Sequence, residues 1–169
     1  MTDAAYKAKL WLEQLSDLYA DAEKTRREIE LIESRINCAV SSYEHTGAGR
    51  ADLIVRQQQH EDALLTYSVK REEYERKYMR FVKQEFACII LFDRLEKPLH
   101  SIILFDRYIN RIKFDDMPKL KRYEIKKRQI YRTFKDALEE LAPLLDKEEP
   151  QAIQAAEDAI RNYIAQASA

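Results

Sequence analysis

Basic side chains of the kinds that bind nucleic acids are concentrated in one segment of this 169-residue chain. Positions 107–135 hold eleven Lys and Arg but only three Asp and Glu, a net charge of +8, so the rest of the chain carries −9. This asymmetry indicates a negatively charged partner for the segment. Arg and Lys bond guanine edges or phosphates, and Gln pairs with adenine. The chemistry fits duplex DNA; a helix face that meets only solvent is the alternative.

The apolar residues of this segment predict a helix with one face toward the protein core and one face toward solvent. Ile130, Phe134 and Ala137 recur at helical spacing, which predicts a helix over 126–141. A recognition helix needs such an apolar face for its own domain and a basic face for the DNA groove. The outward residues predicted to face DNA are Lys126, Lys127, Gln129, Arg132 and Thr133. Of these, Lys127, Gln129 and Arg132 are predicted to contact bases. The residues predicted to contact phosphates from outside this helix are Arg111, Lys119, Lys121 and Arg122.

Two shorter helices are predicted before the recognition helix. Pro98 breaks the preceding helix, and a new one is expected over 99–110, with Ile102 among its inward residues. A second is expected over 116–122, where Asp115 caps it and Pro118 falls in the first turn. The three helices predict a helix-turn-helix DNA-binding domain over 98–145.

This segment resembles the helix-turn-helix of sigma-factor region 4, most closely in the phage-encoded late-gene activators of the ArpU and RinA kind. The family's Arg-Tyr-Ile is matched at 107–109, its pair of acids at 115–116 and its turn isoleucine at Ile125. Its Val-Tyr-Arg-x-x-x-x-Ala-Leu is matched by 130–138. The stretch between the acids and Ile125 is longer than in the family, Pro118 replaces alanine and Lys126 replaces a capping Ser or Thr. The resemblance implies a phage-encoded, sequence-specific transcription regulator in the bacterial cytoplasm, with RNA polymerase as a partner.

The N-terminal part of the chain predicts a long helical hairpin over 1–97. Apolar residues recur every seven positions along 4–43. Along 51–96 a stripe alternates every four and three positions, which is coiled-coil spacing, but polar residues such as Arg71 and Glu85 interrupt it, so imperfect or partner-dependent packing is expected. Both glycines lie in the intervening stretch 45–49, the expected turn. The run 86–92 is apolar all round, so the base of the hairpin is expected to dock on the next domain. The hairpin itself is expected to bind a partner or to form a homodimer.

The composition predicts an all-α protein. The chain has only two glycines and four prolines, far fewer than proteins built from sheets and turns contain. Its 35% of charged residues suits long helices with solvent-exposed faces. After Pro143 a separate C-terminal helix is expected over 150–165, within a third part over 146–169. Cys38 and Cys88 are expected to be reduced, core-facing residues of a cytoplasmic protein. Neither a signal peptide nor an apolar run of membrane-spanning length is expected.

Catalytic and metal-binding motifs are not recognisable in the sequence. His45, His60 and His100 have no Cys, Asp or second His at metal-ligand spacing, and no glycine-rich phosphate loop is present. No enzyme activity, metal or cofactor is therefore expected. Two classes of function remain open: a sequence-specific DNA-binding regulator, and a coiled-coil adaptor or inhibitor that binds protein instead of DNA.

Overall fold

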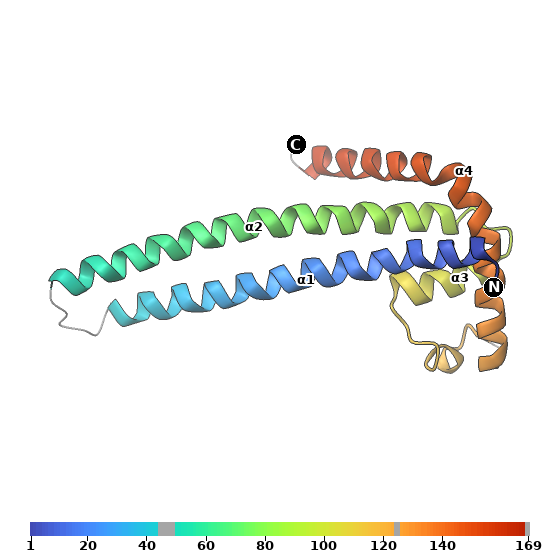
Figure 1. The fold of residues 1–169 in the computed structure, drawn as a ribbon, viewed down its shortest axis with the longest axis horizontal. Coiled ribbons are helices and arrows are strands. Elements are labelled where there is room, and N and C mark those ends of the chain that lie inside the picture. Colours follow the sequence, from blue (N-terminus) through green and yellow to red (C-terminus); the bar gives the residue numbers. More distant parts are fainter. Residues whose placement is uncertain (44–49, 124–125, 168–169) are drawn as a thin grey trace. The chain divides into compact units, whose positions relative to one another are not determined.

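All regular structure in the described residues is helical. The computed structural model describes residues 1–43, 50–123 and 126–167. The elements in chain order are α1 (Asp3–Tyr43), α2 (Arg50–Phe92), α3 (Pro98–Leu104), a π-helical turn η1 (Phe105–Ile109), a 3₁₀ turn η2 (Met117–Lys119) and α4 (Lys127–Ala167) (Figure 1). The predicted all-α class is confirmed. The predicted turn at 45–49 and the turn isoleucine Ile125 lie outside the described residues.

The chain forms two compact units. One consists of residues 1–17 with 80–169, and the other of residues 18–79. The predicted boundaries at 97 and 145 do not coincide with this division, because the first turns of α1 and the last turns of α2 pack in the same unit as α3 and α4. The two units are described separately below.

The unit formed by residues 18–79 is a two-helix arm with little apolar core. On the α1 side only Ala22, Thr25 and Ile29 are buried among its described residues. Polar pairs between the helices are numerous: Lys70 lies 2.8 Å from Glu28, Lys77 lies 3.0 Å from Asp21, and the Tyr67 hydroxyl donates to Glu33 at 2.9 Å. Ion pairs and hydrogen bonds therefore supplement the small apolar core between the two helices.

The other unit holds most of the apolar core. α3 packs against α4, and the predicted docking of the hairpin base is seen in the buried residues Ala87, Cys88, Leu91 and Phe92, although Phe86 is exposed. The largest fully buried apolar side chains of this unit are Leu12, Leu15, Leu91, Phe92, Ile103, Leu104, Met117, Ile130, Leu138 and Leu141. The expectation for the cysteines is half right: Cys88 is buried, which raises the pKa of its thiol, whereas Cys38 is exposed.

α4 corrects the prediction of two separate C-terminal helices. It runs without interruption through Pro143 and Pro150, although its orange and red parts take different directions (Figure 1). A proline removes one backbone donor and crowds the preceding turn, which kinks a helix, while the remaining hydrogen bonds keep it helical. Burial of Ala142, Leu145 and Ala152 on both sides of the kink holds the two halves in one core.

The segment between α2 and α4 is less helical than predicted. The helix expected over 99–110 ends at Leu104 and continues as η1, so Ile103 and Leu104 point inward while Ile102 is exposed. The helix expected over 116–122 is wrong: only the 3₁₀ turn η2 forms, and Leu120 is already extended, with ψ of 131°. The predicted cap is absent too, since Asp115 pairs with Lys127 instead. Pro118 supplies no N–H to continue this turn.

No helix in the described part of the chain combines the length and apolar character needed to cross a membrane.

Candidate nucleic-acid interface

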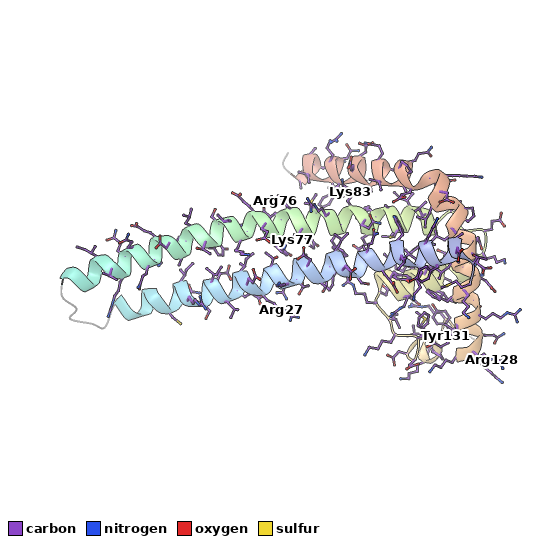
Figure 2. All side chains as sticks on the ribbon, in the orientation of Figure 1. Arg27, Arg76, Lys77, Lys83, Arg128 and Tyr131 are labelled. Carbon is purple, nitrogen blue, oxygen red and sulfur yellow. The ribbon has the colours of Figure 1, made fainter. Side chains whose placement is uncertain are left out.

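The beginning of α4 separates an apolar face from a basic one. Ile130, Phe134 and Ala137 are buried, as predicted for the inward face. Arg128, Arg132 and Lys135 are exposed, and their spacing of four and three residues places them on one stripe of the helix. In Figure 2, Arg128 projects outward from this end of α4.

We call this surface the basic face of α4. It surrounds an open hollow of about 550 Å³, and its residues are Lys126, Arg128, Gln129, Tyr131, Arg132 and Lys135. Its four cations form no ion pair with any carboxylate in the described ranges 1–43, 50–123 and 126–167. Asp136 and Glu139, both exposed, follow directly and end the basic surface after about two turns. The face is thus a short patch of uncompensated positive charge.

Three of the predicted DNA-facing residues are engaged or withdrawn. Lys127 pairs with Asp115, which raises the pKa of the lysine, and the Lys119 ammonium lies 2.7 Å from Asp116. Thr133 is half-buried. The remaining predicted residues on the helix, Lys126, Gln129 and Arg132, all belong to the basic face, and Lys121 is exposed in the preceding linker.

Arg122 belongs to a polar cluster around a buried carboxylate. Asp106 is 1% exposed, and its Oδ2 accepts hydrogen bonds from Arg122 Nε at 2.7 Å and from the Tyr123 hydroxyl at 2.8 Å. Asn110 donates to Oδ1 at 2.8 Å. The hydrogen bonds to Asp106 raise the pKa of Arg122, while burial and then Asp106 raise that of Tyr123. The cluster ties 122–123 to η1, which explains why this stretch is not helical.

Arg111 has the one left-handed backbone conformation among described non-glycine residues, with φ of 55°. Its guanidinium lies 5.3 Å from the centre of the Phe81 ring. The neighbouring Glu85 is half-buried; burial raises the pKa of its carboxyl, and the Arg111 charge opposes that effect. Arg111 is therefore directed toward α2, so a predicted phosphate contact would have to compete with this packing.

Aromatic rings lie beneath and beside the basic face. The Phe114 ring centre is 4.7 Å from that of Tyr131 and 4.9 Å from that of Phe134. Arg107 extends the group, with its guanidinium 5.1 Å above the Phe114 ring. Tyr131 is exposed and labelled in Figure 2, so the basic face presents an aromatic surface together with its cations.

Sequence reasoning missed Arg128 and Lys135 as members of the face. The signal was available, because both share the 128–132–135 spacing with the predicted Arg132. It also missed Asp106, whose role depends on a hydrogen-bond partner sixteen positions away. No local pattern reveals such a pair.

The buried histidine of this unit takes part in a structural pair. His100 Nδ1 lies 2.6 Å from Glu140 Oε2, and Glu140 Oε1 accepts the Glu96 N–H at 2.5 Å. Burial acts to raise the pKa of Glu140, but hydrogen bonds from the Glu96 and Lys97 backbone and from His100 outweigh it and lower the pKa. Within the described residues no group of three or more His, Cys, Asp or Glu is placed to hold a metal ion.

The chain matches no protein-family model, no curated protein and no solved structure. The resemblance to sigma-factor region 4 and the phage activators therefore stays a prediction.

Proposed function

We propose that the protein binds duplex DNA through the basic face of α4 and acts as a sequence-specific transcription regulator. The observation that carries the proposal is the group of four cations, Lys126, Arg128, Arg132 and Lys135, on a short helix face that no described carboxylate neutralises. Phosphate contacts by such side chains release counterions, which supplies most of the affinity of a DNA-binding protein.

The shape of the face supports docking by a single helix. The major groove admits one α-helix, and the hydrophobic inner face of α4 leaves its basic face directed outward. Because the second helix of the predicted helix-turn-helix is replaced by η2, the backbone contacts expected from that helix fall to the linker. Lys121, which is exposed in this linker, is the residue we assign to these contacts.

Regulation of transcription adds a sequence-specific step to this binding. Arg132 and Gln129 are three positions apart on the outward side of α4 and carry the donors and acceptors that read bases. The predicted contact with RNA polymerase and the phage origin belong to the same proposal and rest on the sequence resemblance alone.

DNA binding is tested by fluorescence anisotropy with a labelled mixed-sequence duplex at about 50 mM and about 200 mM salt. Several phosphate contacts predict a loss of affinity of at least about tenfold between the two conditions. The double variant Arg128→Ala, Arg132→Ala should bind more weakly and with a smaller salt dependence. The matched control is Arg35→Ala, Arg80→Ala, which removes two exposed charges elsewhere. Undetectable binding by the unmodified protein at low salt, or equal losses in both variants, would contradict the proposal.

A second candidate function, self-association through the arm of residues 18–79, is favoured by a different observation. Ile54, Leu65, Val69 and Met79 of α2 are all exposed, at 61%, 67%, 57% and 38%. Consecutive members of this group are 11, 4 and 10 residues apart. At 3.6 residues per turn these separations keep all four side chains on one side of α2, where they form an apolar stripe. A helix that is apolar on a face away from its partner has a second surface to bury.

The outer stripe of α2 fits a second copy of the chain. In Figure 2, Arg76 points away from α1, on the side of the stripe, whereas Lys77 lies toward α1. An antiparallel two-fold arrangement centred on Val69 places Asp62 of one copy opposite Arg76 of the other, seven positions on either side. This pairing supports the homodimer predicted from the heptads over a coiled-coil adaptor for a different protein.

Sedimentation velocity of the full chain tests the dimer. The unmodified protein should sediment as a dimer at micromolar concentration, and Leu65→Glu, Val69→Glu should sediment as a helical monomer. The control Leu31→Glu changes an exposed apolar residue of α1. A concentration-independent monomer would contradict self-association and leave the adaptor as the alternative use of the stripe.

A further inference from the structure

A small cavity lies beside η1, separate from the basic face. Its volume is about 280 Å³, and α1, η1, the following linker and α4 contribute to its walls. This lies close to the roughly 300 Å³ lower end of sites that bind small molecules, so it admits one compact ligand. All of its lining residues belong to the unit formed by 1–17 and 80–169.

The wall of the cavity is cationic. Lys9, Arg107 and Arg111 line it against one carboxylate, Glu13, which gives an excess of two positive charges. Lys9 Nζ lies 3.3 Å from Glu13 Oε1. Arg107 instead rests on the Phe114 ring and forms no ion pair with any carboxylate that the structure describes. Its guanidinium donors are therefore available to an anion in the cavity.

The Tyr108 side chain also lines the cavity, and its hydroxyl has no hydrogen-bond partner among the described residues. Tyr108 is 94% buried, since only 6% of its surface is exposed, and its hydroxyl forms no hydrogen bond with any residue in the described part of the chain. Burial raises the pKa of Tyr108, and the nearby charge of Glu13 adds to the increase, so the group stays protonated as a donor. Among the described residues the fully buried polar atoms without a partner are His60 Nδ1 and Gln84 Nε2, so the Tyr108 hydroxyl keeps access to solvent and can donate to a ligand acceptor in the cavity.

Aromatic surface completes the site. The half-buried Phe114 ring lines the cavity and gives a flat ligand an apolar surface to pack against, whereas the Tyr108 ring itself is buried. Arg111, in its left-handed conformation, stands at the same wall, and such strained residues are concentrated at ligand-binding positions.

From these observations we infer that the cavity binds a nucleoside monophosphate. The phosphate lies against Arg107, because a planar guanidinium matches phosphate oxygens with two parallel hydrogen bonds, and Arg111 adds positive charge to the same wall. The base packs against Phe114. Glu13 accepts hydrogen bonds from the ribose hydroxyls, which gives the single carboxylate of this cationic wall a role in binding. The Tyr108 hydroxyl donates to a ligand oxygen. This site is independent of the basic face of α4 and does not rest on the proposed DNA binding.

Isothermal titration calorimetry of the full chain with AMP, GMP, CMP and UMP tests the inference. At least one should bind with a dissociation constant below about 1 mM, and adenosine and inorganic phosphate should each bind at least about tenfold more weakly than the best nucleotide. Tyr108→Phe keeps the ring and removes one hydrogen bond, so it should weaken binding about three- to tenfold. Arg107→Gln should weaken it by at least about tenfold. Circular dichroism must show both variants folded, and Lys113→Gln, an exposed linker residue, is the control that keeps full affinity.

Three further results separate this site from DNA binding and from its other readings. Arg128→Ala, Arg132→Ala should keep nucleotide affinity even where it loses duplex binding, and Tyr108→Phe should do the reverse. A 5′-phosphorylated single-stranded hexanucleotide that competes more strongly than any mononucleotide would assign the site to the end of a nucleic-acid strand. Absence of binding by all four nucleotides at 5 mM, or unchanged affinity in folded Tyr108→Phe and Arg107→Gln, overturns the inference.

Discussion

The guanidinium of Arg122 lies against the carboxylate of Asp106, and this pair fixes the linker that leads into α4. Asp106 is 1% exposed, whereas the Arg122 side chain is 46% exposed, so the pair joins the inside of the unit to its surface. A buried carboxylate that loses its cation keeps its desolvation cost without the compensating charge. Arg122 was predicted to contact phosphate, and this pairing gives it a structural role as well.

Removal of the Arg122 side chain should destabilise the protein. Tyr123 and Asn110 still donate to Asp106 in Arg122→Ala, so we expect a loss of about 1–3 kcal/mol in the free energy of unfolding. Lys121→Ala, one position earlier and exposed, should change it by less than about 0.5 kcal/mol. Urea denaturation followed by circular dichroism measures both. Equal stability of the two variants would mean that Arg122 is a surface residue without a structural role.

The backbone of Arg111 predicts an unusual preference for glycine. A left-handed φ costs a residue with a side chain about 1–2 kcal/mol, and glycine avoids this cost. Arg111→Gly should therefore be more stable than Arg111→Ala by roughly 1 kcal/mol, as measured by thermal or chemical denaturation.

The same pair of substitutions at Lys113 is the control. Lys113 is exposed in the same linker and does not have a positive φ, so alanine should be the more stable residue there because glycine makes the unfolded chain more flexible. The same order at both positions would contradict the left-handed conformation of Arg111.

The ion-pair cluster of the arm predicts a loss of stability in acid. Hydrogen bonds from Lys77 and Lys70 lower the pKa of Glu73 from about 4.5 to about 2. Because the pKa in the folded protein is below that in the unfolded chain, the stabilisation is complete above about pH 4.5 and disappears as the pH falls toward 2. Helicity at an intermediate urea concentration should therefore decrease between pH 4.5 and 2.

Salt and a neutral variant test the origin of this acid effect. The groups are partly exposed to solvent, so high salt should reduce the effect. Glu73→Gln should have a smaller decrease in helicity than the unmodified chain over this pH range. An identical decrease in both would assign the acid sensitivity to other carboxylates.

The periodicity of apolar residues predicted the long helices, because the helical pattern of each one is contained in its own sequence. The heptads of 4–43 and 51–96 gave α1 and α2, and the inward face of Ile130 and Phe134 gave the beginning of α4. The prolines misled the prediction, since a break was expected at Pro143 where the helix only kinks. Whether a proline ends a helix depends on the packing of the segments on either side, which no local pattern contains.

The candidate site was predictable only in part for the same reason. Arg132, Gln129 and Lys126 follow from the outward face of one helix, and the structure places them together. Lys127 and Arg122 depend on more distant partners, Asp115 and Asp106, whereas Lys119 pairs with Asp116 three positions before it. The predicted helix over 116–122 failed because Asp106 holds Arg122 and Tyr123 in a non-helical stretch. Contacts of this kind override local propensity.

The last prediction distinguishes three roles of residues in α4 and the linker before it: contact with bases, contact with phosphates, and stability of the fold. Phe134 is buried, with its ring centre 4.9 Å from that of Phe114, so Phe134→Ala should open a cavity and cost roughly 3–5 kcal/mol of stability. Arg132→Ala should leave the melting temperature unchanged. It should weaken the free energy of binding to a duplex selected from a random pool by about 1–3 kcal/mol, and so reduce the difference in affinity between that duplex and random DNA. Lys121→Ala should weaken binding to all duplexes alike and reduce the salt slope by about one. Melting curves and anisotropy on selected and random duplexes measure all three. Equal losses on every duplex for Arg132→Ala and Lys121→Ala, together with a stable Phe134→Ala, would show that the basic face of α4 is not the surface that reads DNA.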